Sequence, residues 1–448
     1  MKIKNILPYI LLVSTAAKAQ NAPASFTGDI QPAVFSLTMV MLHDVVSPPA
    51  ASRYYAYSMI GAYEIVSRSN SSMVKGSAFI KRFPSFVISL DNKSYDYRIA
   101  AVYCILETGK LMLPSGSRLQ EREDKWFDSL RRKGYSEKIL KQSIAVAAEV
   151  ANHVVAWSKL DNYNRLSAQI RYTPLKGDAY WYPTPPAYME AVEPHWRIIK
   201  PFVIDTCNQF KPLPPVAFSK DSGSKFYIMA REVYDVSKKP LEEQENIAAF
   251  WDCNPFAVSS SGHMMIGFKK ITPGGHWMNI AAIAARKSNL DFDHTIMVHL
   301  VVAITQSDAF VSCWDEKYRS NRIRPETYIN RYIDLEWKPL LQTPPFPEYT
   351  SGHSVVSTAS AEVLSFLFGD RLGFTDDSEI LFGIPPRQFR SFRQASEEAA
   401  ISRLYGGIHY RDAIENGQTE GKKLGEFVVS RLKAAGMTPV PLARTASK

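Results

Sequence analysis

FDHTIMVHLVVAITQSDAFVSCW, residues 292–314, is the stretch of sequence that decides the fold class. Its apolar residues lie on nearly every face of a helix with 3.6 residues per turn, which is typical of a helix buried inside a bundle. Three polar residues, His299, Gln306 and Asp308, interrupt the segment, so we do not expect it to span a membrane. The segment predicts a central helix of an all-helical protein.

Helical periodicity continues on both sides of this segment. Apolar positions recur at helical spacing from Ser136 to Val155, after a stop at Gly134 and a cap at Ser136. Alternating apolar runs long enough for a sheet are missing. Similar helical patterns cover about 33–47, 50–68, 93–113, 223–237, 277–289, 353–368 and 413–434. The sequence therefore predicts an all-α fold.

The periodicity stops between residues 172 and 222, where nine prolines occur. Proline interrupts helices, so this stretch is expected to be an extended connector. We expect two helical bundles, an N-terminal one over 20–171 and a C-terminal one over 223–448, joined by the Pro-rich connector 172–222.

Residues 1–19 are typical of an export signal. Lys2 and Lys4 precede an apolar run, and Ala17-Lys18-Ala19 fits the small residues that signal peptidase accepts. The run is too short for a stable membrane span and contains no Cys for a lipid. We expect cleavage near Ala19 and a periplasmic or secreted mature protein.

The composition and net charge of the chain limit the kinds of partner that it is expected to bind. The chain has 448 residues, 46% of them hydrophobic and 22% charged, which is typical of a globular protein of two or three packing units. The 53 Lys and Arg residues exceed the 44 Asp and Glu residues, for a net charge of +9. Because no basic block gathers this excess, it favours small anions and not nucleic acid as partners.

The cysteines do not indicate a zinc motif or an obligatory disulfide framework. No two of them form a Cys-x-x-Cys pair, and a chain of this length folds without covalent cross-links. We expect most of them to be free and buried, although the three disulfide connectivities that four cysteines allow are formally open. They are Cys104, Cys207, Cys253 and Cys313.

Two short clusters in the C-terminal half combine groups that bind a compact oxyanion. In the first, Lys317 is followed by Arg324-Pro325, and the proline favours an extended backbone at Arg324. The second, FPEYTSGH at 346–353, places a hydroxyl, a glycine and an imidazole where a helix begins, and a helix N-terminus favours anions. Alone, the first cluster also fits a solvated helix face and the second an ordinary Ser N-cap.

A third cluster, SRLYGGIH at 402–409, carries Arg403 and His409. The Gly pair can end the helix between these residues, so that both side chains point to one place. Asp412 with Glu415 is expected to cap the last helix. A turn with an exposed His409 is the alternative interpretation.

Two further histidines are weaker candidates. Ser261-Gly262-His263 repeats the Ser-Gly-His string, but no Lys–Arg-Pro cluster precedes it and no long apolar helix follows it. His276 lies in the same stretch, which we expect to be rich in loops, and packing is its favoured role over lining an entrance.

Taken in order, the three clusters resemble the signature of the vanadium-dependent haloperoxidases, which is shared with bacterial acid phosphatases and type 2 phosphatidic acid phosphatases. The resemblance implies two helical bundles, with the vanadate site in the C-terminal one. It implies that His409 is the single protein ligand of vanadium and that His353 is the acid-base group. The remaining vanadate oxygens would be held by Lys317, Arg324, Ser351, the Gly352 N–H and Arg403. Lys317 would also polarise bound peroxide.

The family resemblance also implies the substrates, hydrogen peroxide and a halide, with hypohalous acid as product. Trp314 and Phe346 match the aromatic positions of the halide pocket, and aromatic edges suit a large, weakly hydrated anion. A His in place of Phe346 would resemble the bromoperoxidases, so its absence leaves iodide or chloride formally open. Iodide is the expected halide because it is the easiest to oxidise, and bromide is the second choice. Two alternatives stay open: an acid phosphatase with His409 as nucleophile, and a non-catalytic exported oxyanion-binding protein.

One departure concerns the group that orients the vanadium ligand. The family often has an Asp four residues after the last His, where this chain has Ala413, with Asp412 one place earlier. If that Asp orients the imidazole, its role must pass to Asp412 or to another group.

Overall fold

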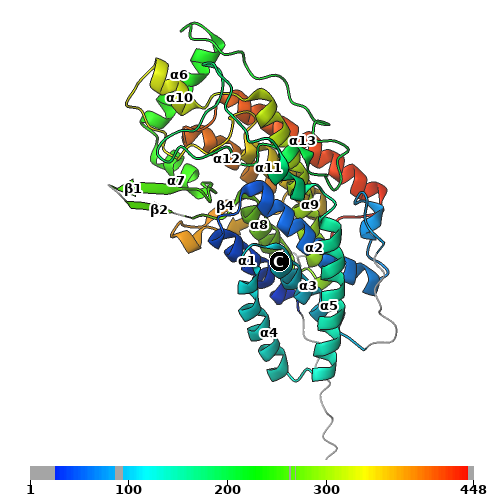
Figure 1. Ribbon diagram of the computed structural model, residues 1–448. Helices are drawn as coiled ribbons and strands as arrows, with labels where there is room; N and C mark the ends of the chain where they lie inside the picture. Colours follow the sequence, from blue (N-terminus) through cyan, green and yellow to red (C-terminus); the bar gives the residue numbers. More distant parts are fainter. Residues whose placement is uncertain (1–25, 86–93, 262–263, 268, 442–448) are drawn as a thin grey trace, which may run out of the picture.

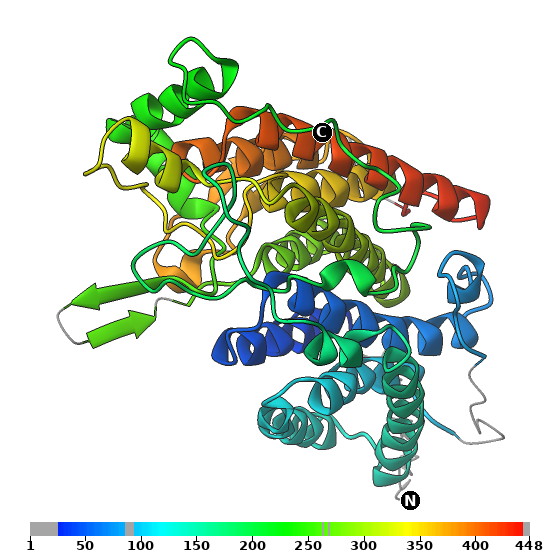
Figure 2. The ribbon, with the colours of Figure 1, turned by 45° about the horizontal axis from the view of Figure 1, so that its top comes forward.

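The computed structural model describes residues 26–85, 94–261, 264–267 and 269–441 (Figure 1). Across these residues the chain forms thirteen α-helices and two short antiparallel hairpins, which confirms the predicted all-α class. The predicted signal segment 1–19 lies outside the described residues. In Figure 2 the blue and cyan N-terminal helices lie below the yellow-to-red C-terminal helices.

The N-terminal helices surround α2, whose residues are buried over most of its length. Pro48 occupies the first turn of α2, and the Ser47 hydroxyl caps it by accepting the Ala50 N–H at 3.3 Å. Ser136 likewise caps α5, as predicted from the sequence. The helices are α1 (Thr27–His43), α2 (Pro48–Ser69), α3 (Tyr97–Met112), α4 (Gln120–Arg132) and α5 (Glu137–Ser158).

The C-terminal helices surround α9, which contains the segment that decided the fold class. α9 packs against α2 on one side and α11 on the other. The helices are α6 (Lys225–Lys238), α7 (Glu242–Phe250), α8 (Pro273–Lys287), α9 (Phe292–Ser320), α10 (Pro325–Tyr332), α11 (Gly352–Phe368), α12 (Phe392–Tyr405) and α13 (Arg411–Ala434). The hairpins pair β1 (Val258–Ser261) with β2 (Met264–Gly267), and β3 (Phe374–Asp376) with β4 (Arg387–Phe389).

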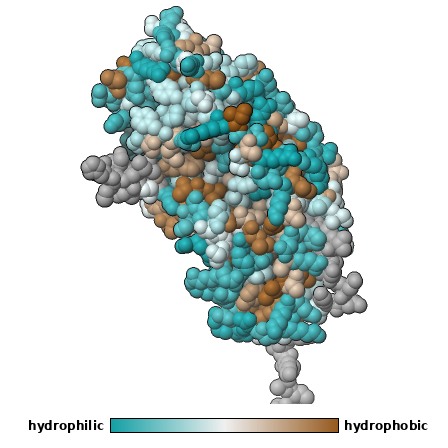
Figure 3. Space-filling model, in the orientation of Figure 1, coloured by the Kyte–Doolittle hydropathy of each residue, from teal (hydrophilic) through white to brown (hydrophobic). Residues whose placement is uncertain are grey.

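By length and composition α9 could cross a membrane, but its most apolar window is wholly buried inside the protein. The core helix of a globular protein meets the same criteria, which agrees with the sequence-based prediction of a central bundle helix. On the face drawn in Figure 3, hydrophobic residues are scattered among hydrophilic ones.

The Pro-rich connector is anchored to α9 by Asp308, one of the polar residues that interrupt the apolar segment. Its carboxylate accepts backbone N–H groups from Phe202, Val203 and Ile204 at 2.6, 2.7 and 2.9 Å. Burial raises the pKa of Asp308 to about 6, and the three N–H donors oppose this rise. The connector contains no α-helix, but its extended stretches alternate with turns, bends and the 3₁₀ helix Trp196–Ile198. The boundaries 20–171, 172–222 and 223–448 stay a prediction.

Several local predictions were wrong. The sequence patterns missed the helices α4, α7, α10 and α12, and α1 begins earlier than expected, at Thr27. His276 lies inside α8 and not in a loop, because Thr272 caps that helix and Pro273 opens it. Asp412 does not cap α13, since this helix follows Tyr410 without a side-chain cap.

The four cysteines are free, and all except Cys207 are buried, as expected.

Candidate active site

His409 lies in the turn between α12 and α13, which Gly406 and Gly407 form as predicted; Gly407 has a φ of +77°. The His409 Nδ1 lies 2.8 Å from the Glu348 Oε1, and its Nε2 lies 3.1 Å from the Arg324 Nη1. Because a guanidinium only donates, Nε2 must be the acceptor and Nδ1 must carry the proton. The lone pair of the His409 Nε2 therefore points toward the Arg324 guanidinium.

The charge state of His409 follows from its surroundings. Burial and the nearby Arg324 and Lys317 hold the pKa of His409 well below its usual range. The imidazole is therefore neutral at neutral pH, which is the state that a metal ligand needs.

Glu348 is the group that orients His409. Its Oε1 also accepts the Tyr410 N–H at 3.0 Å, and its Oε2 accepts the Arg322 Nε at 2.6 Å. Arg322 in turn donates two hydrogen bonds to the Asp412 carboxylate at 2.6 and 2.7 Å. Two residues, Glu348 and Arg322, thus lie between the imidazole and Asp412. Of the two options left open by the sequence, the structure selects another group, Glu348.

Three buried cations surround this histidine without carboxylate partners. Lys317 donates to the carbonyls of residues 347, 348 and 350, and Arg324 to those of residues 346 and 408. Arg403 donates to the Ser402 hydroxyl at 2.9 Å and to the Trp251 carbonyl at 2.6 Å. Among the described residues, no salt bridge joins any of the three to an acidic side chain.

The buried cations carry an electrostatic cost. Burial lowers the pKa of Lys317 to about 8 and that of Arg324 to about 10, and it also lowers the pKa of Arg403. A cluster of this kind is stabilised by an anion that brings negative charge and several acceptor oxygens.

The second predicted cluster lies at the start of α11, as expected. Ser351 is the N-cap residue, and its hydroxyl accepts the Ser354 N–H at 3.3 Å. Gly352 and His353 occupy the first turn, where helix N–H groups lack partners within the helix.

His353 has one unused polar atom. Its buried Nε2 has no hydrogen-bond partner among the described residues. Burial, Arg403 and His409 hold the pKa of His353 well below its usual range, so the imidazole is an unprotonated base at neutral pH. A ligand that offers a proton to this atom would satisfy it.

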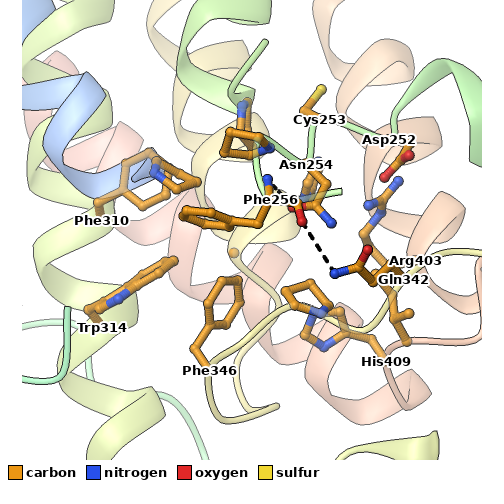
Figure 4. Close-up of a pocket in the computed structure, with 17 residues that line it drawn as sticks. Asp252, Cys253, Asn254, Phe256, Phe310, Trp314, Gln342, Phe346, Arg403 and His409 are labelled. Carbon is orange, nitrogen blue, oxygen red and sulfur yellow. Dashed lines mark hydrogen bonds between the residues drawn. The ribbon is translucent and has the colours of Figure 1, made fainter. Parts of the chain in front are cut away.

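A pocket joins the polar residues to an aromatic wall (Figure 4). Its empty volume is about 520 Å³, which includes the opening. Arg403 and His409 lie at one end, and Phe310, Trp314 and Phe346 lie at the other. The Trp314 and Phe346 rings are in contact, with centroids 5.0 Å apart.

The aromatic wall lies directly beside the cations. The Lys317 Nζ is 5.0 Å from the Phe346 ring centroid and 5.6 Å from that of Trp314. The Arg324 guanidinium carbon is 5.1 Å from the Phe346 ring. The structure thus brings together all nine residues that the sequence singled out for the site.

Sequence reasoning missed part of the pocket. The loop after α7 contributes Asp252, Asn254 and Phe256, and Gln342 donates a hydrogen bond to the Phe256 carbonyl at 3.3 Å. None of these belongs to a motif. Glu348 lies within the string FPEYTSGH, residues 346–353. Its negative charge, among mostly apolar and small residues, is the feature from which a role in the site could have been predicted.

Neither weaker histidine candidate lines the pocket among the described residues. Gly262 and His263 lie outside them. His276 is buried and its ring stacks on Trp251, with centroids 4.5 Å apart, while its nitrogens contact polar side chains.

The residues present fit a vanadate-sized oxyanion on three observations of this structure. Among the described residues the three cations form no salt bridge and the His353 Nε2 has no hydrogen-bond partner, while the His409 Nε2 lies 3.1 Å from the Arg324 guanidinium. Fold and site therefore define a helical protein with a buried oxyanion pocket.

The comparisons place this class of site in a known family. Residues 297–436 match the family model of the VCPO second helical-bundle domain. A solved structure of a bacterial vanadium-dependent iodoperoxidase is 45% identical, with a TM-score of 0.85, and the match covers 92% of this chain and 97% of that one. The chain belongs to the vanadium-dependent haloperoxidases.

More distant structures share the fold. Holo and apo forms of a bacterial vanadium-dependent chloroperoxidase are 15% and 14% identical, with TM-scores of 0.66 and 0.65. Each match covers 87% of this chain, and 93% and 95% of the respective chloroperoxidase chain. No curated protein matches the chain.

Proposed function

We propose that this protein uses vanadate to oxidise iodide with hydrogen peroxide, according to I⁻ + H₂O₂ + H⁺ → HOI + H₂O. The observation that carries the proposal is the neutral His409, whose Nε2 lone pair is held among three buried cations without counter-ions. Vanadate, when bound, supplies an electron-poor centre at which hydrogen peroxide becomes able to oxidise a halide.

The protein groups divide into one ligand and several oxygen donors. His409 would bond vanadium through Nε2, while Glu348 keeps the proton on Nδ1 and fixes the ring. The donors proposed for the vanadate oxygens are Lys317, Arg324, Ser351, the Gly352 N–H and Arg403. Because burial removes water from these groups, their hydrogen bonds to an anion are stronger than on the surface.

His353 is the proposed acid-base group. Its low pKa leaves the ring free to take a proton from hydrogen peroxide, and the protonated ring can then return it to the departing oxygen. The unpartnered Nε2 supplies the atom for this transfer. Lys317, held beside the site as an ammonium, would draw electron density from the bound oxidant and favour attack by the halide.

Iodide is the proposed halide, and bromide is second. The aromatic wall of Trp314 and Phe346 offers an apolar surface, which suits a large anion that gives up its hydration easily. The 45% identity to a protein described as an iodoperoxidase supports the same choice.

One assay panel tests the proposal. Apo-protein is supplied with vanadate, hydrogen peroxide and iodide, bromide or chloride in turn, and hypohalous acid is measured with a chromogenic acceptor. We expect turnover with iodide first and bromide second, and none with His409→Ala. Turnover of p-nitrophenyl phosphate without vanadate, together with no halide oxidation, would instead support the phosphatase, because the pocket recognises oxygens and charge and not vanadium itself.

We also propose that the protein is exported after cleavage near Ala19, on the strength of the charged, apolar and small-residue regions at its N-terminus. N-terminal sequencing of protein recovered outside the cytoplasm should begin near Gln20. Recovery of the uncleaved chain from the cytoplasm alone would refute this.

A further inference from the structure

A second cluster of metal-binding residue types lies behind the loop that forms one wall of the pocket. Cys253 belongs to that loop, His276 to α8, Asp376 to the end of β3, and Glu379 precedes the 3₁₀ helix Ile380–Phe382. All four side chains are buried. One thiol, one imidazole and two carboxylates from four separate segments therefore lie close together in the interior of the protein.

The distances between donor atoms match a transition-metal site. The Cys253 Sγ lies 3.4 Å from the His276 Nδ1, and the same Nδ1 lies 3.4 Å from the Glu379 Oε1. The three donor atoms lie within 4.8 Å of one another. Zinc bonds of about 2.0–2.3 Å at tetrahedral angles put neighbouring N, O and S donors roughly 3.3–3.6 Å apart.

The second carboxylate fixes which histidine nitrogen is available. The Asp376 Oδ2 lies 2.8 Å from the His276 Nε2, while its Oδ1 accepts the Ser378 N–H and hydroxyl at 3.0 and 2.6 Å. An acceptor on Nε2 keeps the proton there and leaves the Nδ1 lone pair for the other two side chains. A carboxylate behind a ligating histidine is the usual support of a metal site.

Glu379 is the independent observation that points to a missing ligand. Both of its oxygens are buried and have no hydrogen-bond partner among the described residues. An unpartnered buried carboxylate is costly, and a bound cation removes that cost.

The cluster attracts positive charge. The His276 ring lies between the Asp376 carboxylate at Nε2 and the Cys253 thiol and Glu379 carboxylate at Nδ1. A proton on Nδ1 is one way to supply this charge, but a single proton leaves at least one Glu379 oxygen without a partner. A divalent cation accepts a thiolate, an imidazole and a carboxylate together, and the S, N and O donor set favours zinc among the common ions.

We propose that Cys253, His276 and Glu379 bind a divalent transition-metal ion, zinc in the first place, with Asp376 orienting His276. None of the residues assigned to vanadate belongs to this site, although Cys253 also lines the pocket. The ion would tie the loop 252–256, which lines the pocket, to α8 and to the segment after β3. The ion would therefore hold this wall of the pocket in place.

The test is metal analysis of the full-length protein, purified without chelators from zinc-supplemented cultures. We expect one zinc ion per chain by inductively coupled plasma mass spectrometry. Cys253→Ser and Glu379→Gln should each lose most of it, and Asp376→Asn should weaken the affinity about 10- to 100-fold. Co²⁺ added to the metal-free protein should give a thiolate-to-metal charge-transfer band, which Cys253→Ser lacks.

Two controls make the result specific. Cys207→Ser removes a half-buried free thiol outside the cluster and should keep its zinc. His409→Ala should keep its zinc while losing vanadium in the same measurement. If wild-type protein that is folded by circular dichroism binds neither Zn²⁺ nor Co²⁺, the proposal is overturned. Full zinc occupancy in folded Cys253→Ser or Glu379→Gln would overturn it equally.

Discussion

Glu348→Gln is the substitution that most directly tests how the vanadium ligand is held. The carboxylate accepts from His409 and Tyr410 through Oε1 and from Arg322 through Oε2. A glutamine has the same shape but only one acceptor oxygen. If that oxygen faces His409, the amide NH₂ faces the Arg322 guanidinium, which also donates.

The opposite orientation of the amide is equally unfavourable. The NH₂ group would then face the His409 Nδ1 and force the proton onto Nε2, the atom needed for vanadium. Either way one charge-assisted hydrogen bond is lost, which is about 1.5–3 kcal/mol. Loss of a group that orients a metal ligand usually costs about 10- to 100-fold in affinity, or roughly 1.4–2.8 kcal/mol, so the two figures agree.

The assay is calorimetric titration of apo-protein with vanadate. We expect the Kd of Glu348→Gln to rise about 10- to 100-fold. Glu123→Gln is the matched control: this carboxylate is also buried and pairs with Lys110 at 2.7 Å, but in the N-terminal bundle. Thermal unfolding of both variants checks that they are folded. A folded Glu348→Gln protein with wild-type vanadate affinity would refute the proposed role of Glu348.

Four further predictions concern the same pocket. His409→Ala should abolish tight vanadate binding and turnover with the fold intact, so near-stoichiometric vanadium in the purified variant would contradict the ligand assignment. His353→Ala should retain much of the vanadate but lose most peroxidase turnover, and an unchanged kcat would remove His353 from the mechanism. Phosphate should compete with vanadate for the apo-protein, and Arg403→Ala should weaken both anions; competition titrations that show loss of vanadate alone would exclude a shared pocket. Because burial lowers the pKa of Lys317 to about 8, oxyanion affinity should fall as the pH rises through that value. Titrations below and above pH 8 should show this fall in affinity for the wild-type protein and not for Lys317→Met. Identical pH profiles of the two proteins would contradict the prediction.

Sequence reasoning located the oxyanion residues because their spacing is short and their backbone requirements are local. Arg324 takes the extended conformation that Pro325 imposes, with a ψ of 153°. Ser351 caps α11, and Gly407 takes the positive φ that allows His409 to turn back. Local rules of this kind can be read from a few neighbouring residues.

The partners of these residues could not be read in the same way. Glu348 meets His409 across 61 positions of sequence, and Arg322 meets Asp412 across 90. The sequence held Asp412 as a possible cap because a carboxylate near a helix start usually serves that role. The tertiary contact with Arg322 prevailed, since a buried guanidinium needs its charge balanced.

The missed helices have a different cause. α4 is rich in charged residues, and α7 and α10 have only nine and eight residues, so none carries a long apolar stripe. Pro273 and the following glycines suggested a loop, although a proline in the first turn after a Thr cap is a normal helix start. The Thr272 and Pro273 capping signal therefore outweighs the effect of the glycines that follow it.

The positive charge of the pocket explains both its affinity and its cost. The pKa of Lys317 falls from its ordinary 10.5 to about 8, so keeping its charge in the free pocket costs about 3 kcal/mol. Arg324 and Arg403 add to this cost, because burial lowers their pKa values too. An oxyanion bound among these side chains restores the charge balance. The free energy lost by the empty protein is thus regained on binding, which ties tight oxyanion affinity to the stability of the C-terminal bundle.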